Sequence, residues 1–114
     1  MENDEPFLHE AIALSKSAVK NGDEPFGSLL VKDGDVILRA VNSVYTGHDM
    51  TNHAELNLVK LAAKHYDPAF LDHCTIYTST EPCAMCSGAI YWSGIGRMVF
   101  ASRKRGLARS LGSG

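Results

Sequence analysis

The first segment of the chain carries apolar side chains at the spacing of one face of an α-helix. This stripe consists of Leu8, Ile12, Ser15 and Val19, with Ala11 and Ala18 beside it. Asp4 is the predicted N-cap, because a carboxylate accepts hydrogen bonds from the unpaired N–H groups of a first turn. Asn21-Gly22 is typical of a helix end. The pattern therefore predicts a helix between Asp4 and Asn21.

Two β-rich runs follow, Phe26–Lys32 and Asp35–Asn42, and the dipeptide Asp33-Gly34 joins them. A type I′ turn needs a positive φ at both central positions, and Asp-Gly is among the dipeptides that meet this need. We predict an antiparallel hairpin here.

The rest of the chain alternates between helical spacing of apolar residues and short β-rich runs. Helical spacing returns in HAELNLVKLAAKHY, with Thr51 as its predicted N-cap and Pro68 beyond its end. The later elements are a strand at Cys74–Ser79, a helix whose first turn begins at Pro82, and a strand at Met98–Ser102. The order α-β-β-α-β-α-β predicts an α/β sheet covered by helices, antiparallel in its hairpin and parallel later. No repeat or linker marks a boundary, so residues 1–114 are predicted to form one domain.

The composition is that of a water-soluble globular protein, since 45% of the 114 residues are hydrophobic and 21% are charged. The longest apolar runs are far shorter than the ~20 residues that a membrane-spanning helix needs. The acidic N-terminus does not resemble a secretory signal. Three cysteines are too few for a disulfide framework, and an odd number fits a reducing compartment. We therefore predict a cytoplasmic protein with no membrane partner.

The net charge of −2 conceals an asymmetry. Residues 1–81 hold all 13 acidic residues, whereas residues 82–114 hold none. The basic residues of that second part are Arg97, Arg103, Lys104, Arg105 and Arg109. A basic end can attract nucleic acid, here through residues 97–109, although such a run is more often a solvated tail or an interface. Residues 103–114 read as a flexible basic tail or as an engineering scar that ends in Gly-Ser-Gly.

A Cys-x-x-Cys motif, Cys83 to Cys86, opens the third predicted helix. Residues three apart face the same way on a helix, so both sulfur atoms can reach one metal ion. A helix N-terminus also lowers thiol pKa values, which favours the thiolate that a metal needs. By itself the motif equally fits half of a zinc ribbon or a thioredoxin-like redox pair. The third thiol, Cys74, is predicted to be a buried small hydrophobe.

The tripeptide His53-Ala54-Glu55 favours a catalytic metal over these alternatives. His53 also lies where a loop meets a helix, and one imidazole with two thiolates gives zinc three protein ligands. Three ligands leave a tetrahedral position open, which is typical of a catalytic zinc. Zinc lowers the pKa of water toward ~7. Glu55 is not needed as a ligand and can carry protons to a ring nitrogen and to a leaving amine.

These motifs resemble the cytidine-deaminase-like superfamily, whose signature is H-x-E followed by P-C-x-x-C. The residues that carry the resemblance are His53-Ala-Glu55, Glu81-Pro-Cys-Ala-Met-Cys86, Pro25-Phe-Gly27, Asp33-Gly34, Asn42 and Ser87–Trp92. The resemblance implies a three-layer α/β/α fold with a mixed sheet, a zinc (Zn²⁺) cofactor, and hydrolytic release of ammonia from a nucleobase or nucleoside. It implies His53, Cys83 and Cys86 as metal ligands and Glu55 as the catalytic residue.

Within the superfamily, the chain is most similar to bacterial guanine deaminases, bacterial tRNA adenosine deaminases and fungal-type cytosine deaminases. The similarity implies that Asn42 hydrogen-bonds the base, that Phe26 and Trp92 pack on it, and that the Ala54 backbone N–H holds an oxygen atom. Trp92 favours guanine or a related purine as substrate. The alternative is adenosine or cytosine in tRNA or in single-stranded nucleic acid. On residue type alone, Asn42 equally ends a strand, and Phe26 and Trp92 are core aromatics.

Relatives in the guanine and tRNA branches continue beyond the fourth strand, so we expect a C-terminally short fold with an exposed sheet edge. Such an edge predicts a homodimer. Two other functions stay open at this point. One is a catalytically silent zinc domain, and the other is a thiol–disulfide oxidoreductase that uses Cys83 and Cys86.

Overall fold

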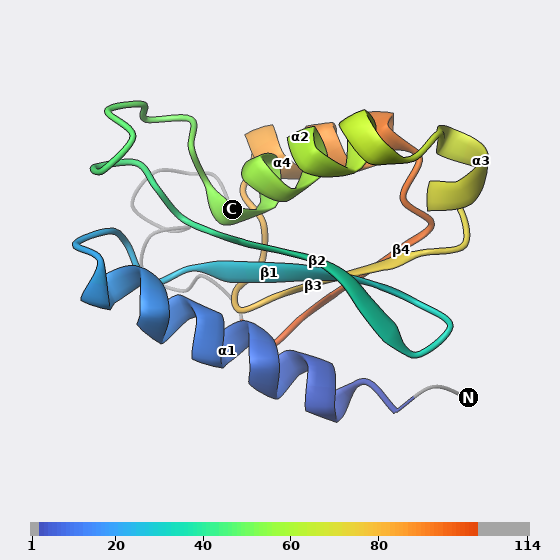
Figure 1. Cartoon of the computed structure of the whole chain (residues 1–114), viewed down its shortest axis with the longest axis horizontal. Helices are drawn as coiled ribbons and strands as arrows, with labels where there is room; N and C mark the ends of the chain where they lie inside the picture. Colours follow the sequence, from blue (N-terminus) through green and yellow to red (C-terminus); the bar gives the residue numbers. More distant parts are fainter. Residues whose placement is uncertain (1–2, 103–114) are drawn as a thin grey trace.

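The computed structural model describes residues 3–102 (Figure 1). Its elements, in chain order, are α1 (Glu5–Lys20), β1 (Gly27–Lys32), β2 (Asp35–Val41), α2 (Ala54–His65), α3 (Pro68–Leu71), β3 (Thr75–Thr78), α4 (Ala84–Ser93) and β4 (Arg97–Phe100). Every predicted helix and strand is present, within a few residues of its predicted ends. The short helix α3 was not predicted, because a single turn carries no periodicity. Within the described residues, no helix is long and apolar enough to cross a membrane.

The four strands form one sheet in the order β2-β1-β3-β4. The β1–β2 hairpin is antiparallel, and the φ values of Asp33 (52°) and Gly34 (82°) confirm the predicted turn. The pairing of β1 with β3 is also antiparallel, whereas β3 and β4 are parallel. Helix α1 covers one face of the sheet, and α2 and α4 cover the other (Figure 1). The predicted mixed sheet in a three-layer α/β/α fold is thereby confirmed.

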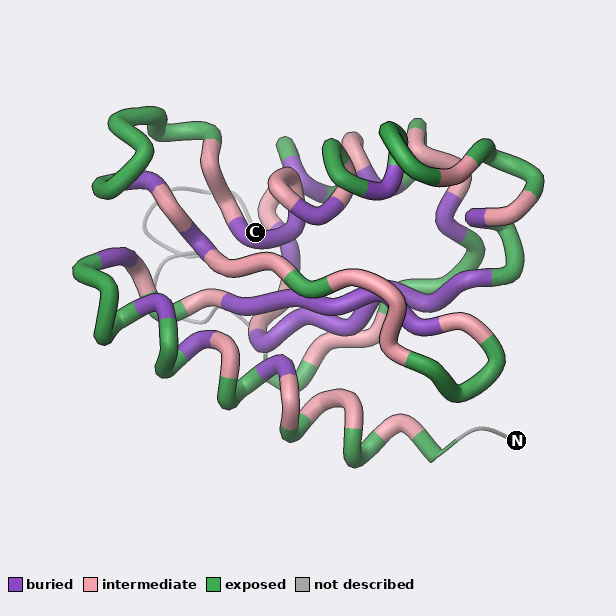
Figure 2. Tube along the Cα trace, in the orientation of Figure 1, coloured by how far each residue is buried: buried purple, intermediate pink, exposed green. Residues whose placement is uncertain are grey.

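Two apolar clusters fill the spaces on either side of the sheet. Successive side chains of the central strands point alternately into one cluster and the other. On the α1 side, Leu29, Val31 and Tyr77 pack with Ala11. On the side of α2 and α4, the buried residues are Leu30, Leu58, Ala62, Leu71, Cys74, Ile76, Ile90 and Ile95. The central strands β1 and β3 are accordingly buried along their length (Figure 2). Cys74 lies in this core, as predicted, and burial raises the pKa of its thiol.

The apolar stripe predicted for α1 was partly wrong. The residues that α1 buries are Ala11, Ser15 and Ala18, whereas Ile12 is 39% and Val19 53% exposed. The cause is a close approach of the helix to β1. A Cβ atom added at Gly27 would lie 2.5 Å from the Leu14 Cβ atom and 2.8 Å from the Ala11 carbonyl oxygen. Only small side chains fit on the helix face that lies this near the sheet.

Asp4 precedes α1 as predicted, but its side chain makes no capping hydrogen bond. Its carboxylate instead accepts the Tyr77 hydroxyl (2.6 Å) and two bonds from the Arg97 guanidinium (3.0 and 2.7 Å). The hydrogen bonds from Arg97 and then from Tyr77 lower the pKa of Asp4. Burial, with the hydrogen bond to Asp4 next, raises the pKa of Tyr77 to about 12. The charge-assisted bonds therefore join the start of α1 to β3 and β4.

We expect Asp4→Ala to destabilise the fold by about 1–3 kcal/mol, because it leaves the buried Tyr77 hydroxyl without its acceptor. The exposed Asp4–Arg97 ion pair contributes little beyond this. Since the folded pKa of Asp4 lies below its ordinary value of 3.8, its contribution is present above pH 3.8 and is lost as the pH falls below it. Urea unfolding at pH 7 and pH 3 measures both effects. Glu5→Gln, in the same turn, is the control, and an equal loss in both variants would contradict the assignment.

Candidate metal centre

The N-cap of helix α2 lies two residues later than predicted. It is His53, with extended backbone angles (φ −70°, ψ 151°) and no side-chain capping bond. Thr51, the predicted cap, instead binds the carboxylate of Asp49 through its hydroxyl (2.6 Å) and its backbone N–H (2.8 Å). Because the Thr51 hydroxyl is bonded to Asp49, it does not cap the helix, and Thr51 belongs to the preceding loop. The His53 imidazole is consequently placed beyond the end of the helix.

Helix α4 begins in the same manner. Its N-cap is Cys83, again extended (φ −74°, ψ 176°) and without a side-chain capping bond. Cys86 lies in the first turn and is fully buried. The helix ends at Gly94, whose φ of 90° is the left-handed conformation common at helix ends. Both helices thus start at a candidate metal ligand that stands where Ser, Thr, Asp or Asn is usual.

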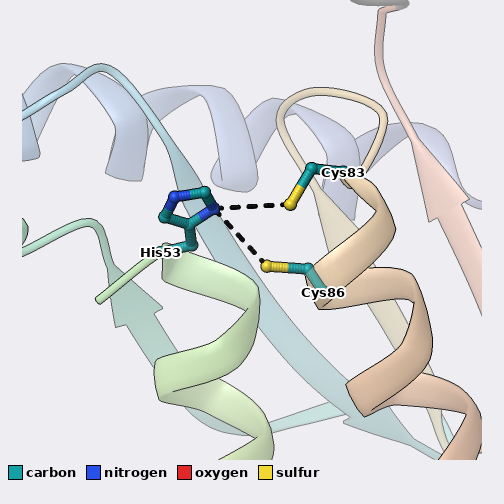
Figure 3. A group of neighbouring side chains, drawn as sticks. All are labelled: His53, Cys83 and Cys86. Atoms are coloured by element: carbon teal, nitrogen blue, oxygen red, sulfur yellow. Dashed lines mark hydrogen bonds between the residues drawn. The ribbon is translucent and has the colours of Figure 1, made fainter. Parts of the chain in front are cut away.

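The side chains of His53, Cys83 and Cys86 converge (Figure 3). The Nδ1 atom of His53 lies 3.6 Å from each sulfur atom, and the three candidate ligand atoms lie within 4.8 Å of one another. Zinc bonds of ~2.3 Å to sulfur and ~2.0–2.1 Å to nitrogen, at a tetrahedral angle, separate the two atoms by roughly 3.6 Å. The donor set and its spacing therefore fit tetrahedral zinc.

The prediction that a helix N-terminus lowers the thiol pKa was wrong for Cys86. Burial, followed by the negative charge of Glu55, raises the pKa of this thiol far above its usual range. A hydrogen bond from the Leu56 backbone N–H acts in the lowering direction and is outweighed. A thiol in such surroundings becomes a thiolate when a cation compensates its charge, which is what a metal site provides.

Glu55 is buried in the first turn of α2, with 6% of its surface exposed. Residues two apart do not share a lateral face of a helix. This rule does not separate His53 from Glu55, because His53 lies at the cap rather than within the helix. The effect of Glu55 on Cys86 places its carboxylate within electrostatic reach of the candidate ligands.

A family model named "Cytidine and deoxycytidylate deaminase zinc-binding region" matches residues 1–102. The chain belongs to this family. The resemblance drawn from the two motifs is confirmed, and so is zinc as the predicted cofactor. Membership also removes the zinc-ribbon and thioredoxin-like interpretations of the Cys83 and Cys86 pair.

Relatives in this deaminase family are named for different substrates. The chain is 49% identical over 109 residues to a probable cytosine deaminase of Schizosaccharomyces pombe, which covers 95% of the chain and 65% of that relative. It is 38% identical over 98 residues to a tRNA-specific adenosine deaminase of Aquifex aeolicus, covering 86% of the chain and 65% of the relative. The structure of the Bacillus subtilis guanine deaminase matches with a TM-score of 0.84 and 40% identity, over 96% of this chain and 70% of that one. The chain thus spans just under two thirds of these two sequence relatives.

The four candidate substrate residues of the deaminase domain lie in different surroundings. Asn42 is fully buried, and its amide oxygen accepts the backbone N–H groups of Val44 (3.0 Å) and Glu24 (3.4 Å). Phe26 is half-buried, and Ala54 is buried as the first residue of α2. Trp92 is 83% exposed and stacks edge-on against Tyr91, so its interpretation as a core aromatic was wrong.

Three polar residues that support the centre were missed in the sequence. The buried Ser28 of β1 donates its hydroxyl to the Ala54 carbonyl (3.0 Å), which fixes the first turn of α2. Asp23 accepts the backbone N–H groups of Tyr45 and Thr46 (2.9 Å each) and so holds the loop before α2. Asn57 binds the end of β2. Ser28 and Asn57 could have been found in the sequence, because each is a polar residue between apolar neighbours. No sequence pattern marks Asp23.

We expect Cys86→Ser to lose stoichiometric zinc and Cys74→Ala, its control, to retain it. Serine is a poor zinc ligand, whereas Cys74 lies in the apolar core. Bound zinc should stabilise the wild-type fold by about 4 kcal/mol when free zinc is 1,000 times its Kd. Elemental analysis, with thermal unfolding in the presence and absence of a chelator, measures both. A Cys86→Ser protein that keeps one zinc per chain would remove Cys86 from the ligand set.

Proposed function

We propose that the chain is a zinc-dependent hydrolytic deaminase of a nucleobase or nucleoside, with guanine or a related purine as substrate. The observation that carries the proposal is the convergence of His53, Cys83 and Cys86 beside the buried carboxylate of Glu55. An imidazole and two thiolates suit zinc, and a carboxylate near them suits proton transfer. Family membership supports the same reaction class.

In this proposal His53, Cys83 and Cys86 hold zinc, which when bound supplies the activation of water near neutral pH. Glu55 moves the protons. The oxygen of water bonds to the carbon that bears the amine, and Glu55 carries one proton of that water to the adjacent ring nitrogen. It then carries the second proton to the amine, the carbon–nitrogen bond breaks, and ammonia leaves as the carbonyl forms.

The residues proposed to hold the base are Asn42, Phe26, Ala54 and Trp92. The Asn42 amide nitrogen carries two hydrogens, and one faces the Glu24 carboxylate at 3.4 Å. In this proposal the other hydrogen is donated to an acceptor atom of the base. The backbone N–H of Ala54, in the first turn of α2, has no partner within the helix and is suited to an oxygen atom. Phe26 and Trp92 offer aromatic faces for stacking.

A small base is favoured over a nucleic acid by the charges of the described region. Of the predicted basic residues, Arg97 is paired with the Asp4 carboxylate, which offsets its positive charge and reduces its attraction for a phosphate group. The others, within residues 103–109, lie outside the described residues. Cytosine is the second candidate substrate, because the Schizosaccharomyces pombe relative named for it is 49% identical to the chain.

The homodimer and the cytoplasmic location stay predictions. Tyr91 and Trp92 on α4 are both largely exposed, and neighbouring exposed aromatic residues are typical of interfaces. Sedimentation velocity measures the oligomeric state directly.

A substrate panel tests the proposed reaction. We expect the zinc-loaded protein to release ammonia from guanine in preference to cytosine, adenine, their nucleosides and tRNA. Release from cytosine alone would support the deaminase reaction but show that the substrate is a pyrimidine. Release from tRNA alone would likewise support the reaction but show that the substrate is a nucleic acid. A fully zinc-loaded protein that releases no ammonia from the whole panel would instead be the catalytically silent domain.

Glu55→Gln should retain zinc and lower kcat by about 10²–10⁴-fold, the usual contribution of a positioned acid or base. The amide keeps the shape of the side chain but cannot accept the proton. Zinc content and ammonia release on the same preparation measure both quantities, and Glu5→Gln, on α1 across the sheet from the candidate centre, is the control. Undiminished turnover in Glu55→Gln would assign proton transfer to another group.

A further inference from the structure

We propose that Asn57 is a positioning residue of the metal centre, whose amide fixes the first turn of α2, and with it His53, against the end of β2. The inference rests on the proposed zinc ligands but not on the identity of the substrate. Asn57 lies one turn after His53 and has no place in the two motifs of the sequence analysis.

The Asn57 side chain joins three segments. Its Nδ2 atom lies 2.9 Å from the Val41 carbonyl oxygen, 3.1 Å from the Ser43 hydroxyl oxygen and 3.4 Å from the Asn52 carbonyl oxygen. An amide nitrogen has two hydrogens. The two shorter contacts, both to the segment that ends β2, therefore dominate.

These bonds act on His53 through the backbone. Asn57 donates its own N–H to the His53 carbonyl (2.9 Å), and the Asn52 carbonyl also accepts the N–H of Ser43 (2.9 Å). The peptide units on both sides of His53 are thus tied to the segment after β2. Because the His53 side chain makes no capping bond, the position of its ring follows that of this backbone.

The separation of the ligands depends on this attachment. His53 comes from α2, whereas both thiols come from α4, so the 3.6 Å distances hold only while the two helix starts keep their places. Ser28 holds the Ala54 carbonyl from β1, and Asn57 holds the same turn from β2. Loss of the second attachment lets the turn move relative to α4, and a displaced ligand weakens zinc binding.

The test is the zinc affinity of Asn57→Leu, measured by competition with a chromophoric chelator at fixed pH. Leucine keeps the branched shape of the side chain and is the better helix former, but it is larger and donates no hydrogen bond. We expect zinc to bind about 10–100-fold more weakly, as is usual when a residue that orients a metal ligand is lost. Asp67→Ala is the matched control. It removes the side chain that caps α3 (3.0 Å to the Phe70 N–H), beyond the far end of α2, and should leave zinc affinity unchanged.

A structural role alone would lower the melting temperatures of the zinc-free and zinc-loaded proteins equally. Positioning instead reduces the increase in melting temperature that zinc produces. Wild-type zinc affinity in a destabilised Asn57→Leu protein would therefore overturn the proposal. None of these measurements uses deaminase activity, so failure of the proposed function leaves their outcome unaffected.

Ser43→Ala is the milder variant and decides the question if Asn57→Leu does not fold. It removes one of the two short acceptors, so we expect roughly a two- to tenfold loss of zinc affinity, the equivalent of one hydrogen bond. Adding Ser43→Ala to Asn57→Leu should cause no further loss, because the shared contact is already absent. Unchanged affinity in Ser43→Ala, or full additivity in the double variant, would contradict the proposal.

Discussion

The meeting of two helix N-termini at one metal site is the constraint on which the rest of the structure depends. His53 and Cys83 occupy the N-caps of α2 and α4, so both helices forgo a side-chain cap, which is commonly worth about 1 kcal/mol. The charges explain why this arrangement is tolerated. Two thiolates and Glu55 exceed the charge of a zinc ion by about one negative charge. Each helix N-terminus is equivalent to roughly half a positive charge, and together they offset that excess.

The sheet serves this constraint by holding the helix starts where they converge. Ser28 on β1 and Asn57, through the end of β2, fix the first turn of α2 from neighbouring strands. On the opposite face, α1 lies so close to Gly27 that only small side chains fit beneath it. Asp4 then joins the start of that helix to Tyr77 and Arg97. Polar contacts thus place the elements, and the two apolar clusters provide the bulk of the burial.

The features that could be predicted from the sequence are those that local chemistry determines. Asp33-Gly34 specifies its turn through backbone preference alone, and the spacing of Cys83 and Cys86 specifies two sulfur atoms on one turn. The predictions that were wrong concern side chains that bind residues far away in the sequence, or side chains for which two hydrogen-bond partners compete. Asp4 binds side chains 73 and 93 residues along the chain, which no local pattern records. Thr51 has an ordinary capping side chain, but its hydroxyl is hydrogen-bonded to Asp49 instead of capping α2.

The Cys86 thiol shows why the chemistry of a site is harder to predict than its residues. The local rule that a helix N-terminus lowers a thiol pKa is sound, but it acts against burial and the charge of Glu55, and both depend on the completed fold. Trp92 makes the same point for the substrate. Its residue type suits either a core or a stacking surface, and only the fold leaves it exposed on α4. Relatives named for guanine, cytosine and tRNA adenosine match the same part of the chain, so the metal motifs alone do not select the substrate. Selectivity among these relatives must therefore depend on residues outside the metal motifs, whose placement follows from tertiary contacts rather than from motif spacing.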